Sequence, residues 1–241
     1  MTRHSRLLQL VLRILGPVWR FRPIALLSEL VFWNLWLRRR SADGSMAELL
    51  RADRPVHQSL RTLIEQVPGD PVRILEVGAG PIASVGLSHP TRRLEITATD
   101  VLADEYDRVL RWRGISPPIR TIYADAECLT TRFGANAFDL VYAANCVDHM
   151  QNPLAAIREM VGVLRPGGHV VMDHMLDEGA HQNYAGLHQW NLRVENGRLL
   201  LWNRRQRHDL SVLLASSCDV RASCSDGNLH VEIRKREEKV R

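Results

Sequence analysis

The stretch VRILEVGAGP occupies residues 72–81 and decides the fold. Its first six residues have the length and the apolar content of a buried strand, and Gly78 and Gly80 follow directly. A strand that runs through glycines into a helix brings backbone N–H groups close to a bound ligand. Gly78-x-Gly80-x-x-Ala83 also satisfies the dinucleotide-binding fingerprint, with alanine as its third member. The stretch therefore predicts a nucleotide-type ligand at the end of a buried strand.

Strand and helix patterns alternate after this stretch. Further strands are expected at 93–100, 119–125, 138–145 and 169–174, with helices at 104–112 and 153–164. Such alternation predicts an α/β fold with a parallel, doubly wound sheet. Two hairpin signals, Asn196-Gly197 and Asp226-Gly227, then predict that the sheet ends in an antiparallel edge. We therefore expect a mostly parallel, seven-stranded sheet with an antiparallel terminal hairpin.

The N-terminal region differs in composition from the rest of the chain. Residues 1–40 contain eight arginines and one glutamate among apolar runs, whereas the remaining residues are close to neutral. The apolar runs are shorter than the about 20 residues that a membrane-spanning helix needs. We expect two amphipathic helices broken near Gly16-Pro17 and Pro23, and another helix over 53–67. The pattern predicts an N-terminal helical cap over 1–70 and a second domain over 71–241.

Composition also bears on partners and location. The net charge of +5 is concentrated in residues 1–40, so the near-neutral remainder argues against a nucleic-acid partner. A basic amphipathic helix binds anionic membrane surfaces, so peripheral membrane contact through residues 1–40 stays open. The four cysteines include no Cys-x-x-Cys pair, which argues against a zinc site and against a disulfide framework. We expect a cytoplasmic protein, with membrane association as the open alternative; the sequence leaves its oligomeric state undetermined.

Three acidic residues near strand ends narrow the choice of ligand. Glu76 precedes the glycines, where a carboxylate would repel a pyrophosphate but suits a ligand that carries positive charge. Asp100 lies about 20 residues past Gly80, where an acid binds ribose hydroxyls. Asp125 closes the third expected strand, where it can accept a hydrogen bond from an adenine amino group. Together these residues favour an adenosine ligand with a cationic part.

With Phe138-Asp-Leu-Val and Leu164-Arg-Pro-Gly-Gly168, these motifs resemble the class I S-adenosylmethionine (SAM)-dependent methyltransferases over roughly 72–175. The phrase Gly-Leu-His-Gln-Trp-Asn191 is similar to one in a bacterial methyltransferase subgroup whose substrates are not established, and we expect a small-molecule acceptor. The resemblance implies SAM as the cofactor. The residues at its cofactor-binding positions are Glu76, Gly78, Ala79, Gly80, Asp100, Asp125, Ala126, Asn145 and Cys146.

The acceptor end of such a site requires a group that takes a proton. A hydroxyl or ammonium acceptor loses a proton during transfer, and histidine has the nearest unperturbed pKa. The candidates follow the fourth and fifth expected strands: Asp148, His149, His174 and His188. The wide spacing of the histidines offers no short-range ligand pair, so no metal is expected. The strand-four end also lacks the Asn-Pro-Pro-Tyr pattern of enzymes that methylate nucleobase amino groups.

The expected function is therefore SAM-dependent methyl transfer to an oxygen or nitrogen of a small-molecule acceptor. Two alternatives stay open. The Gly-x-Gly-x-x-Ala pattern also fits an NAD(P)-dependent oxidoreductase. A catalytically silent SAM-fold scaffold, held at a membrane or a partner protein, would carry the same cofactor motifs.

Overall fold

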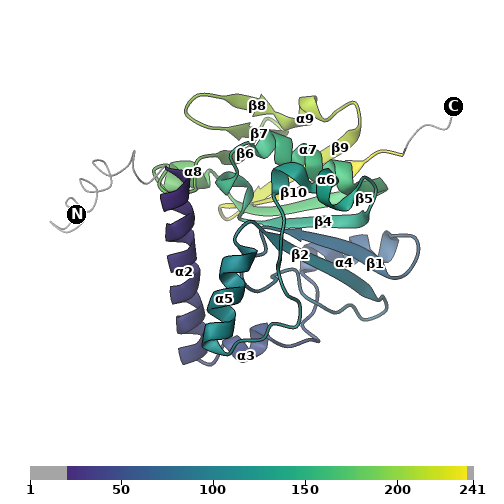
Figure 1. The fold of residues 1–241 in the computed structure, drawn as a ribbon. Helices are drawn as coiled ribbons and strands as arrows, with labels where there is room; N and C mark the ends of the chain where they lie inside the picture. The colour runs from purple at the N-terminus through teal and green to yellow at the C-terminus, as the bar shows by residue number, and fades with distance from the viewer. Residues whose placement is uncertain (1–20, 238–241) are drawn as a thin grey trace.

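In the computed structural model, which describes residues 21–237, the centre of the molecule is a seven-stranded sheet (Figure 1). Its strand order is β3-β2-β1-β4-β5-β10-β9. The parallel strands are β1 (Val72–Val77), β2 (Leu94–Asp100), β3 (Ile122–Tyr123), β4 (Phe138–Ala144) and β5 (Leu164–Met175). Antiparallel to β5 and to each other run β10 (Asn228–Lys235) and β9 (Cys218–Ser225). The predicted sheet with its antiparallel terminal hairpin is thus confirmed.

Two details of the sheet prediction are wrong. The expected third strand over 119–125 shrinks to Ile122–Tyr123, whose side chains are both exposed at the sheet edge. The Asn196-Gly197 hairpin does not join the main sheet, because it belongs to a separate antiparallel sheet. That sheet consists of β6 (Asn191–Glu195), β7 (Arg198–Trp202) and β8 (Arg207–Asp209). Leu199 and Leu201 pack into the main core, so the hairpin covers a face of the large sheet instead of extending its edge.

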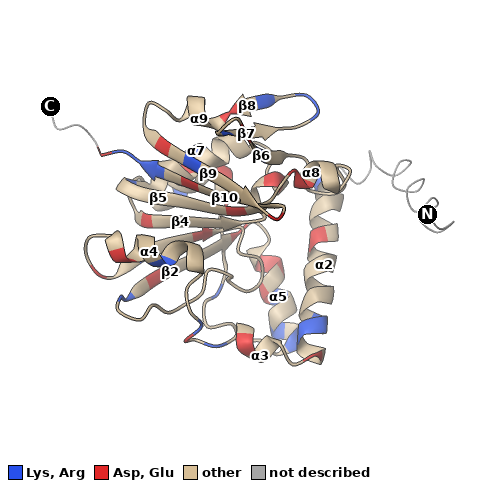
Figure 2. Ribbon diagram, turned by 180° about the vertical axis from the view of Figure 1, so that it is seen from behind, with Lys and Arg blue, Asp and Glu red and all other residues tan. Residues whose placement is uncertain are grey.

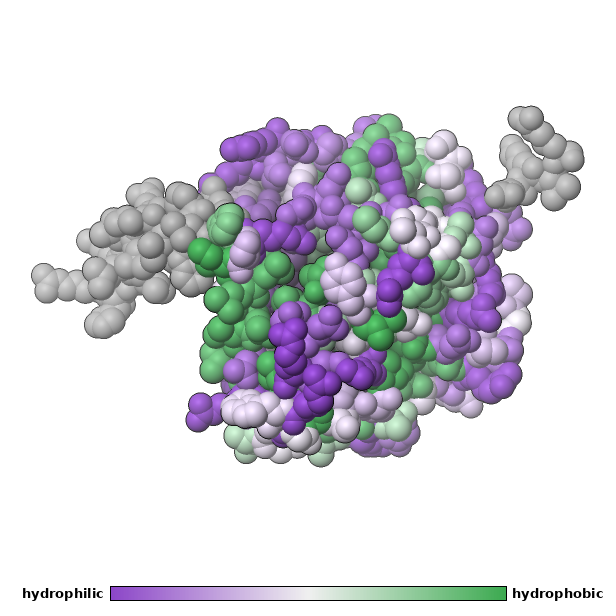
Figure 3. All heavy atoms as spheres, in the orientation of Figure 1, coloured by the Kyte–Doolittle hydropathy of each residue, from purple (hydrophilic) through white to green (hydrophobic). Residues whose placement is uncertain are grey.

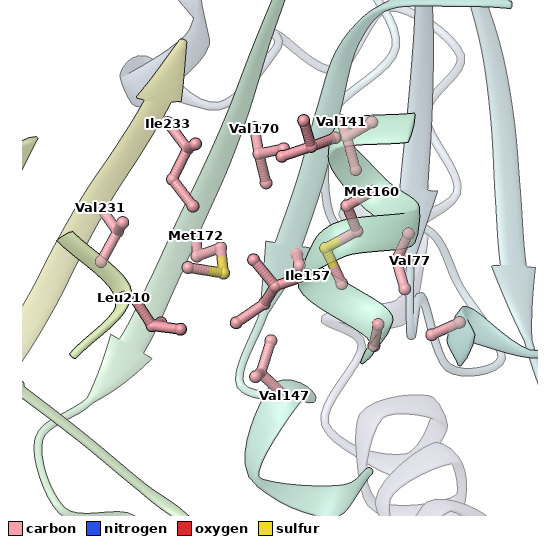
Figure 4. Close-up of a cluster of buried hydrophobic side chains, with 14 of the residues drawn as sticks. Val77, Val141, Val147, Ile157, Met160, Val170, Met172, Leu210, Val231 and Ile233 are labelled. Atoms are coloured by element: carbon pink, nitrogen blue, oxygen red, sulfur yellow. The ribbon is translucent and has the colours of Figure 1, made fainter. Parts of the chain in front are cut away.

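Side chains alternate between the two faces of the sheet, and helices cover both. Ile74 of β1 packs with Leu60 and Ile64 of α4 (Gln58–Gln66), whereas the neighbouring Leu75 belongs to the opposite core with α7 (Pro153–Val163). Figure 4 shows this second core, in which Ile157 and other side chains of α7 meet the strands. The alternation has the period of two that a pleated strand requires.

Helix α4 is shorter than predicted. It begins at Gln58 and not near residue 53, because residues 54–57 pair with residues 85–88. Residues 85–88 follow the glycine loop, which comprises residues 78–83 after β1. Val56 N donates to Ser88 O at 2.8 Å, and His57 N donates to Val85 O at 2.7 Å. These bonds hold residues 54–57 extended beside the loop that follows β1.

Three helices lie beside the carboxyl ends of the parallel strands (Figure 1): α2 (Arg22–Ala42), α3 (Met46–Leu49) and α5 (Ala103–Arg113). Helix α2 has Pro23 in its first turn, where proline needs no N–H partner. Its buried Leu37 packs with Leu110 of α5, and Arg113 donates to Asn34 Oδ1 at 2.6 Å. The break predicted near Gly16-Pro17 lies outside the described residues. Among the helices of residues 21–237, none is long and apolar enough to cross a membrane.

The remaining helical segments connect these elements. They are η1 (Ala126–Cys128), α6 (Leu129–Phe133), η2 (Val147–His149), α8 (Glu178–His181) and α9 (Leu210–Leu213). Two of them, η1 and η2, follow strands β3 and β4 directly, so their first residues stand at the same edge of the sheet as the glycine loop.

Candidate active site

A cavity of about 680 Å³ lies at the carboxyl ends of β1, β2 and β4. Ligands of open parallel sheets bind at this edge, and the volume is ordinary for a small-molecule site. Helix α2 forms one wall with Glu29, Phe32 and Trp33, and the segment between β5 and β6 contributes Leu187 and His188. Seven of the nine predicted cofactor residues line the cavity: Gly78, Ala79, Asp100, Asp125, Ala126, Asn145 and Cys146. Glu76 and Gly80 are not part of this lining.

Both glycines of the loop after β1 are required by the chain's own packing. Gly78 and Gly80 have φ angles of 67° and 64°, which side chains disfavour. A Cβ on Gly78 would lie 2.4 Å from Cβ of Cys146, and one on Gly80 would lie 2.8 Å from Cζ2 of Trp33. The sequence motif implied close approach of a ligand, whereas these glycines let β4 and α2 close over the loop.

Glu76 is buried at the end of β1 and only half satisfied. Its Oε1 accepts hydrogen bonds from Ser84 N at 2.8 Å, Ser84 Oγ at 2.6 Å and Val85 N at 3.2 Å. Its Oε2 is buried and has no partner within the described part of the chain. Burial raises the pKa of Glu76 against these hydrogen bonds. A cationic group beside the loop would therefore satisfy this oxygen.

Asp100 and Asp125 both line the cavity and both fix local backbone. Asp100 accepts from Gly80 N at 3.1 Å and from Leu102 N at 2.9 Å, and burial raises its pKa. Asp125 caps η1 by accepting from Glu127 N at 2.9 Å. Because carboxylate oxygens accept more than one hydrogen bond, both residues can still accept from hydroxyl or amino groups of a ligand.

Sequence reasoning missed Arg54, which also lines the cavity. Its guanidinium donates to the carbonyl of Ala83 in the glycine loop, while its Nε is buried without a partner in the described structure. Burial lowers the pKa of Arg54, and the charge of Glu76 opposes that shift. No motif marks this residue, because only the pairing of residues 54–57 with the loop after β1 brings it here.

Three of the four predicted catalytic residues come together. Nδ1 of His188 lies 2.7 Å from Oδ2 of Asp148 and 3.1 Å from Nε2 of His149. Asp148 and His149 belong to η2, and His188 precedes β6. Both histidines line the cavity, whereas Asp148 is buried behind them. The cluster therefore presents imidazoles to the cavity, and a carboxylate supports them.

The electrostatics of this pair are reciprocal. Burial alone would raise the pKa of Asp148, but the hydrogen bond from His188 and the charges of the nearby histidines lower it. Burial disfavours protonated His188, yet the hydrogen bond and charge of Asp148 prevail and raise the pKa of His188. Asp148 is therefore ionised near neutral pH and stabilises a proton on His188.

The fourth candidate, His174, is placed differently. It is buried in β5, does not line the cavity, and its Nε2 has no partner among residues 21–237. Burial lowers the pKa of His174 to about 4, so this side chain is neutral.

The catalytic cluster also has metal-binding spacing. The ligand atoms of Asp148, His149 and His188 lie within 4.8 Å of one another, an arrangement that can hold a metal ion. The absence of a metal stays a prediction.

Asn145 and Cys146 directly follow β4, beside the glycine loop. Asn145 has a left-handed φ of 45°, and its Oδ1 accepts from Met175 N at 2.9 Å. The Cys146 thiol donates to the Val77 carbonyl at 3.2 Å, and burial raises its pKa. Cys146 is therefore a neutral packing group and not a thiolate nucleophile.

Comparison with known proteins bears on this geometry. Residues 75–172 match a family model described as a methyltransferase domain. The fold is similar to a chain in the Haloferax volcanii complex of the methyltransferase activator Trm112, with a TM-score of 0.50, 11% identity, and coverage of 85% of this chain and 97% of that one.

Two further structures are similar to a lesser degree. A SAM-dependent methyltransferase from Mesorhizobium loti gives a TM-score of 0.44 and 16% identity over 72% of this chain and 96% of its own. The carbon methyltransferase of CurJ gives 0.49 and 14% over 72% of this chain, and the match spans about half (51%) of that chain. The family match covers β1 through most of β5, which build the cavity floor, and it shows that residues 75–172 form a methyltransferase domain.

Proposed function

We propose that this methyltransferase transfers a methyl group to an oxygen or nitrogen of a small-molecule acceptor, and that His188 takes the acceptor proton. The observation that carries the proposal is the 2.7 Å contact between His188 and buried Asp148 at the cavity wall. Histidine paired with a buried carboxylate is a common arrangement for a general base. The near-neutral charge of residues 41–241 supports a small molecule over a nucleic acid.

The residues around the cavity fit SAM. Arg54, which lines the cavity, suits the carboxylate of the methionine part, and the unpartnered Oε2 of Glu76, which lies behind the lining, suits its ammonium. Asp100 suits the ribose hydroxyls, and Asp125 suits the adenine amino group. When bound, SAM supplies a methyl group attached to a positively charged sulfur, and the sulfur is the leaving group, as a neutral thioether.

The chain's own part is then positioning and proton removal. With Asp148 ionised, Nδ1 of His188 carries the proton of the 2.7 Å hydrogen bond, which leaves Nε2 as the basic nitrogen. Holding the acceptor in line with the methyl group supplies a large part of the rate. Removing its proton adds on the order of 10²–10⁴-fold. The ring of His149 lies 4.4 Å from the ring of His188, centroid to centroid, and so restricts the orientation of the imidazole that acts as base.

The walls favour an acceptor with an apolar or aromatic part. Phe32, Trp33 and Trp36 of α2 line one side of the cavity, and Leu187 lines the other. We propose that residues 1–70 act as a cap over the cofactor and the acceptor, and that 71–241 form the methyltransferase domain. The same proposal includes a cytoplasmic location with contact to a membrane surface through residues 1–40.

A panel of hydroxylated and amine-bearing aromatic compounds, with release of S-adenosylhomocysteine as readout, tests the function. We expect turnover with at least one compound, and a loss of about 100-fold or more in His188→Ala while S-adenosylhomocysteine still binds. Near-normal turnover in His188→Ala would contradict the assignment of the base. Binding without turnover across the panel would favour the silent scaffold, and a thermal shift with NADH but not with SAM would favour an oxidoreductase.

A further inference from the structure

Helix α2 and the residue before it expose one apolar face over residues 21–35. The side chains on it, here called the α2 stripe, are Phe21, Ile24, Leu27, Val31, Phe32 and Leu35. Leu27, Val31 and Leu35 are 59%, 51% and 58% exposed, and their spacing of four residues places them on one side of the helix. Figure 3 shows apolar surface gathered over α2. Contiguous patches of this kind mark interaction sites.

The opposite face of α2 is already in use. Ala25 and Leu37 are buried, and Trp33 contacts Tyr106 of α5 edge-on, with 6.3 Å between ring centroids. Arg113 is hydrogen-bonded to Asn34. The helix is therefore held in place by its inner face, and the α2 stripe is not needed to attach it to the sheet.

The charged side chains at the ends of α2 are mostly arginines, and Asp43 caps its C-terminal end. Arg38, Arg39 and Arg40 lie near the C-terminal end of α2, where Figure 2 shows basic side chains, and Arg22 is its first residue. The single acidic residue of α2, Glu29, lines the cavity and accepts a hydrogen bond from Trp33 Nε1 at 2.8 Å. The surface is therefore an apolar strip with arginines near its ends and no acidic residue on it.

We propose that the α2 stripe docks in the plane of an anionic phospholipid surface. The proposal rests on the membrane contact proposed above for residues 1–40 and assigns it to one helix face. An apolar face flanked by arginines matches acyl chains bordered by phosphate headgroups. Trp112 of α5, 77% exposed and next in sequence to the Arg113 that binds α2, is a side chain typical of this interface.

Charge also separates this occupant from two others. Residues 1–20 contain four arginines and no acidic residue, so packing them on the α2 stripe would bring like charges together. A second copy of the chain would oppose its own basic helix ends to those of the first. An anionic bilayer instead neutralises both segments, because its phosphate headgroups attract basic side chains near the surface.

The position of the α2 stripe links docking to the cavity. Phe32 belongs to the stripe and also lines the cavity, so a docked bilayer would lie against the cavity wall formed by α2. An amphiphilic acceptor carried in that bilayer would have a short path to the site.

Sedimentation of the full chain with vesicles tests the proposal. We expect binding to phosphatidylcholine vesicles that contain phosphatidylglycerol, weaker binding without it, and weakening by salt. The triple variant Leu27→Ser, Val31→Ser, Leu35→Ser removes exposed side chains only and should lower the partition coefficient on the order of tenfold or more. The matched control Val212→Ser, Leu213→Ser changes exposed apolar residues of α9 and should bind as the wild type does.

Two outcomes would overturn the docking proposal. Either the wild type fails to bind anionic vesicles, or the triple variant binds as well as the wild type. Light scattering without lipid provides a third check, since a dimer that the triple variant dissociates would assign the α2 stripe to a second copy. S-adenosylhomocysteine affinity, measured on each variant, should stay unchanged. If the methyl-transfer proposal fails instead, His188→Ala would keep near-normal turnover while the full chain still binds vesicles as expected.

Discussion

Asp148 and His188, forty residues apart in sequence, meet through a 2.7 Å contact between Oδ2 and Nδ1. Asp148 follows β4 on the buried η2 turn, and His188 lies in the segment that precedes β6. The carboxylate is buried and its Oδ1 has no partner among the described residues, so its negative charge acts mainly on the histidine beside it. This pair determines how the proposed base titrates.

Replacing Asp148 by asparagine should lower the pKa of His188. In the wild type, burial favours neutral His188, but the hydrogen bond and charge of Asp148 prevail and raise this pKa above its usual value. A base acts when unprotonated, so wild-type kcat/KM should rise with pH through a value above the ordinary histidine pKa. In Asp148→Asn this limb should move to lower pH, and maximal turnover should fall on the order of 100-fold or more because the tautomer is no longer fixed.

The pH profile of S-adenosylhomocysteine release measures both effects. An acidic limb that stays in place in Asp148→Asn would show that His188 does not govern it. Chelator treatment is a useful companion measurement, since the same side chains have metal-binding spacing. Loss of turnover on chelation, restored by a divalent ion, would contradict proton transfer to a free imidazole.

His174 provides a contrast between two histidines that the sequence treats alike. It is buried away from the cavity lining, and burial lowers its pKa to about 4. We expect His174→Gln to leave kcat/KM and its pH dependence nearly unchanged, apart from a lower melting temperature. A loss as large as that of His188→Ala, with melting unaffected, would return His174 to the catalytic group.

The sequence predicts those features that rest on local signals. The bounds of β1 are recovered in full, because an apolar run is followed directly by glycines. Asp148 and His149 are predicted beside the cavity because strand ends of a parallel sheet meet at one edge. The contact with His188 and the position of Arg54 depend on how loops pack, and no local pattern encodes that. The sheet to which the Asn196-Gly197 hairpin belongs is likewise set by burial of its apolar face.

We expect Asp100 to bind the cofactor in addition to holding local backbone. It lines the cavity and accepts from two backbone N–H groups, which leaves lone pairs for ligand hydroxyls. Asp100→Asn keeps an acceptor for the backbone but removes the charge, so S-adenosylhomocysteine affinity should fall about 10- to 100-fold. Asp104→Asn, on the exposed side of α5, serves as the control in the same calorimetric titration. Equal affinity in the two variants would remove Asp100 from the ribose site.

Arg54 should recognise the amino-acid end of the cofactor. Its buried Nε has no partner in the described structure, and its guanidinium is anchored to the loop carbonyl of Ala83. A carboxylate would complete this site with charge-assisted hydrogen bonds, which contribute about 1.5–3 kcal/mol. Arg54→Ala should therefore weaken S-adenosylhomocysteine binding about tenfold or more, and Arg54→Lys should weaken it less.

The distinguishing ligand is 5′-methylthioadenosine, which keeps the adenosine and the sulfur but lacks the amino-acid carboxylate. If Arg54 binds that carboxylate, Arg54→Ala changes the affinity for methylthioadenosine little, so the loss is specific to the ligand with the amino-acid part. A general distortion of the loop at Ala83 would instead weaken both ligands equally. Arg61→Ala, on the exposed side of α4, controls for the removal of a positive charge and should leave both affinities as they are in the wild type. Equal losses for the two ligands in Arg54→Ala would reduce Arg54 to a support of the loop, with its charge directed to Glu76.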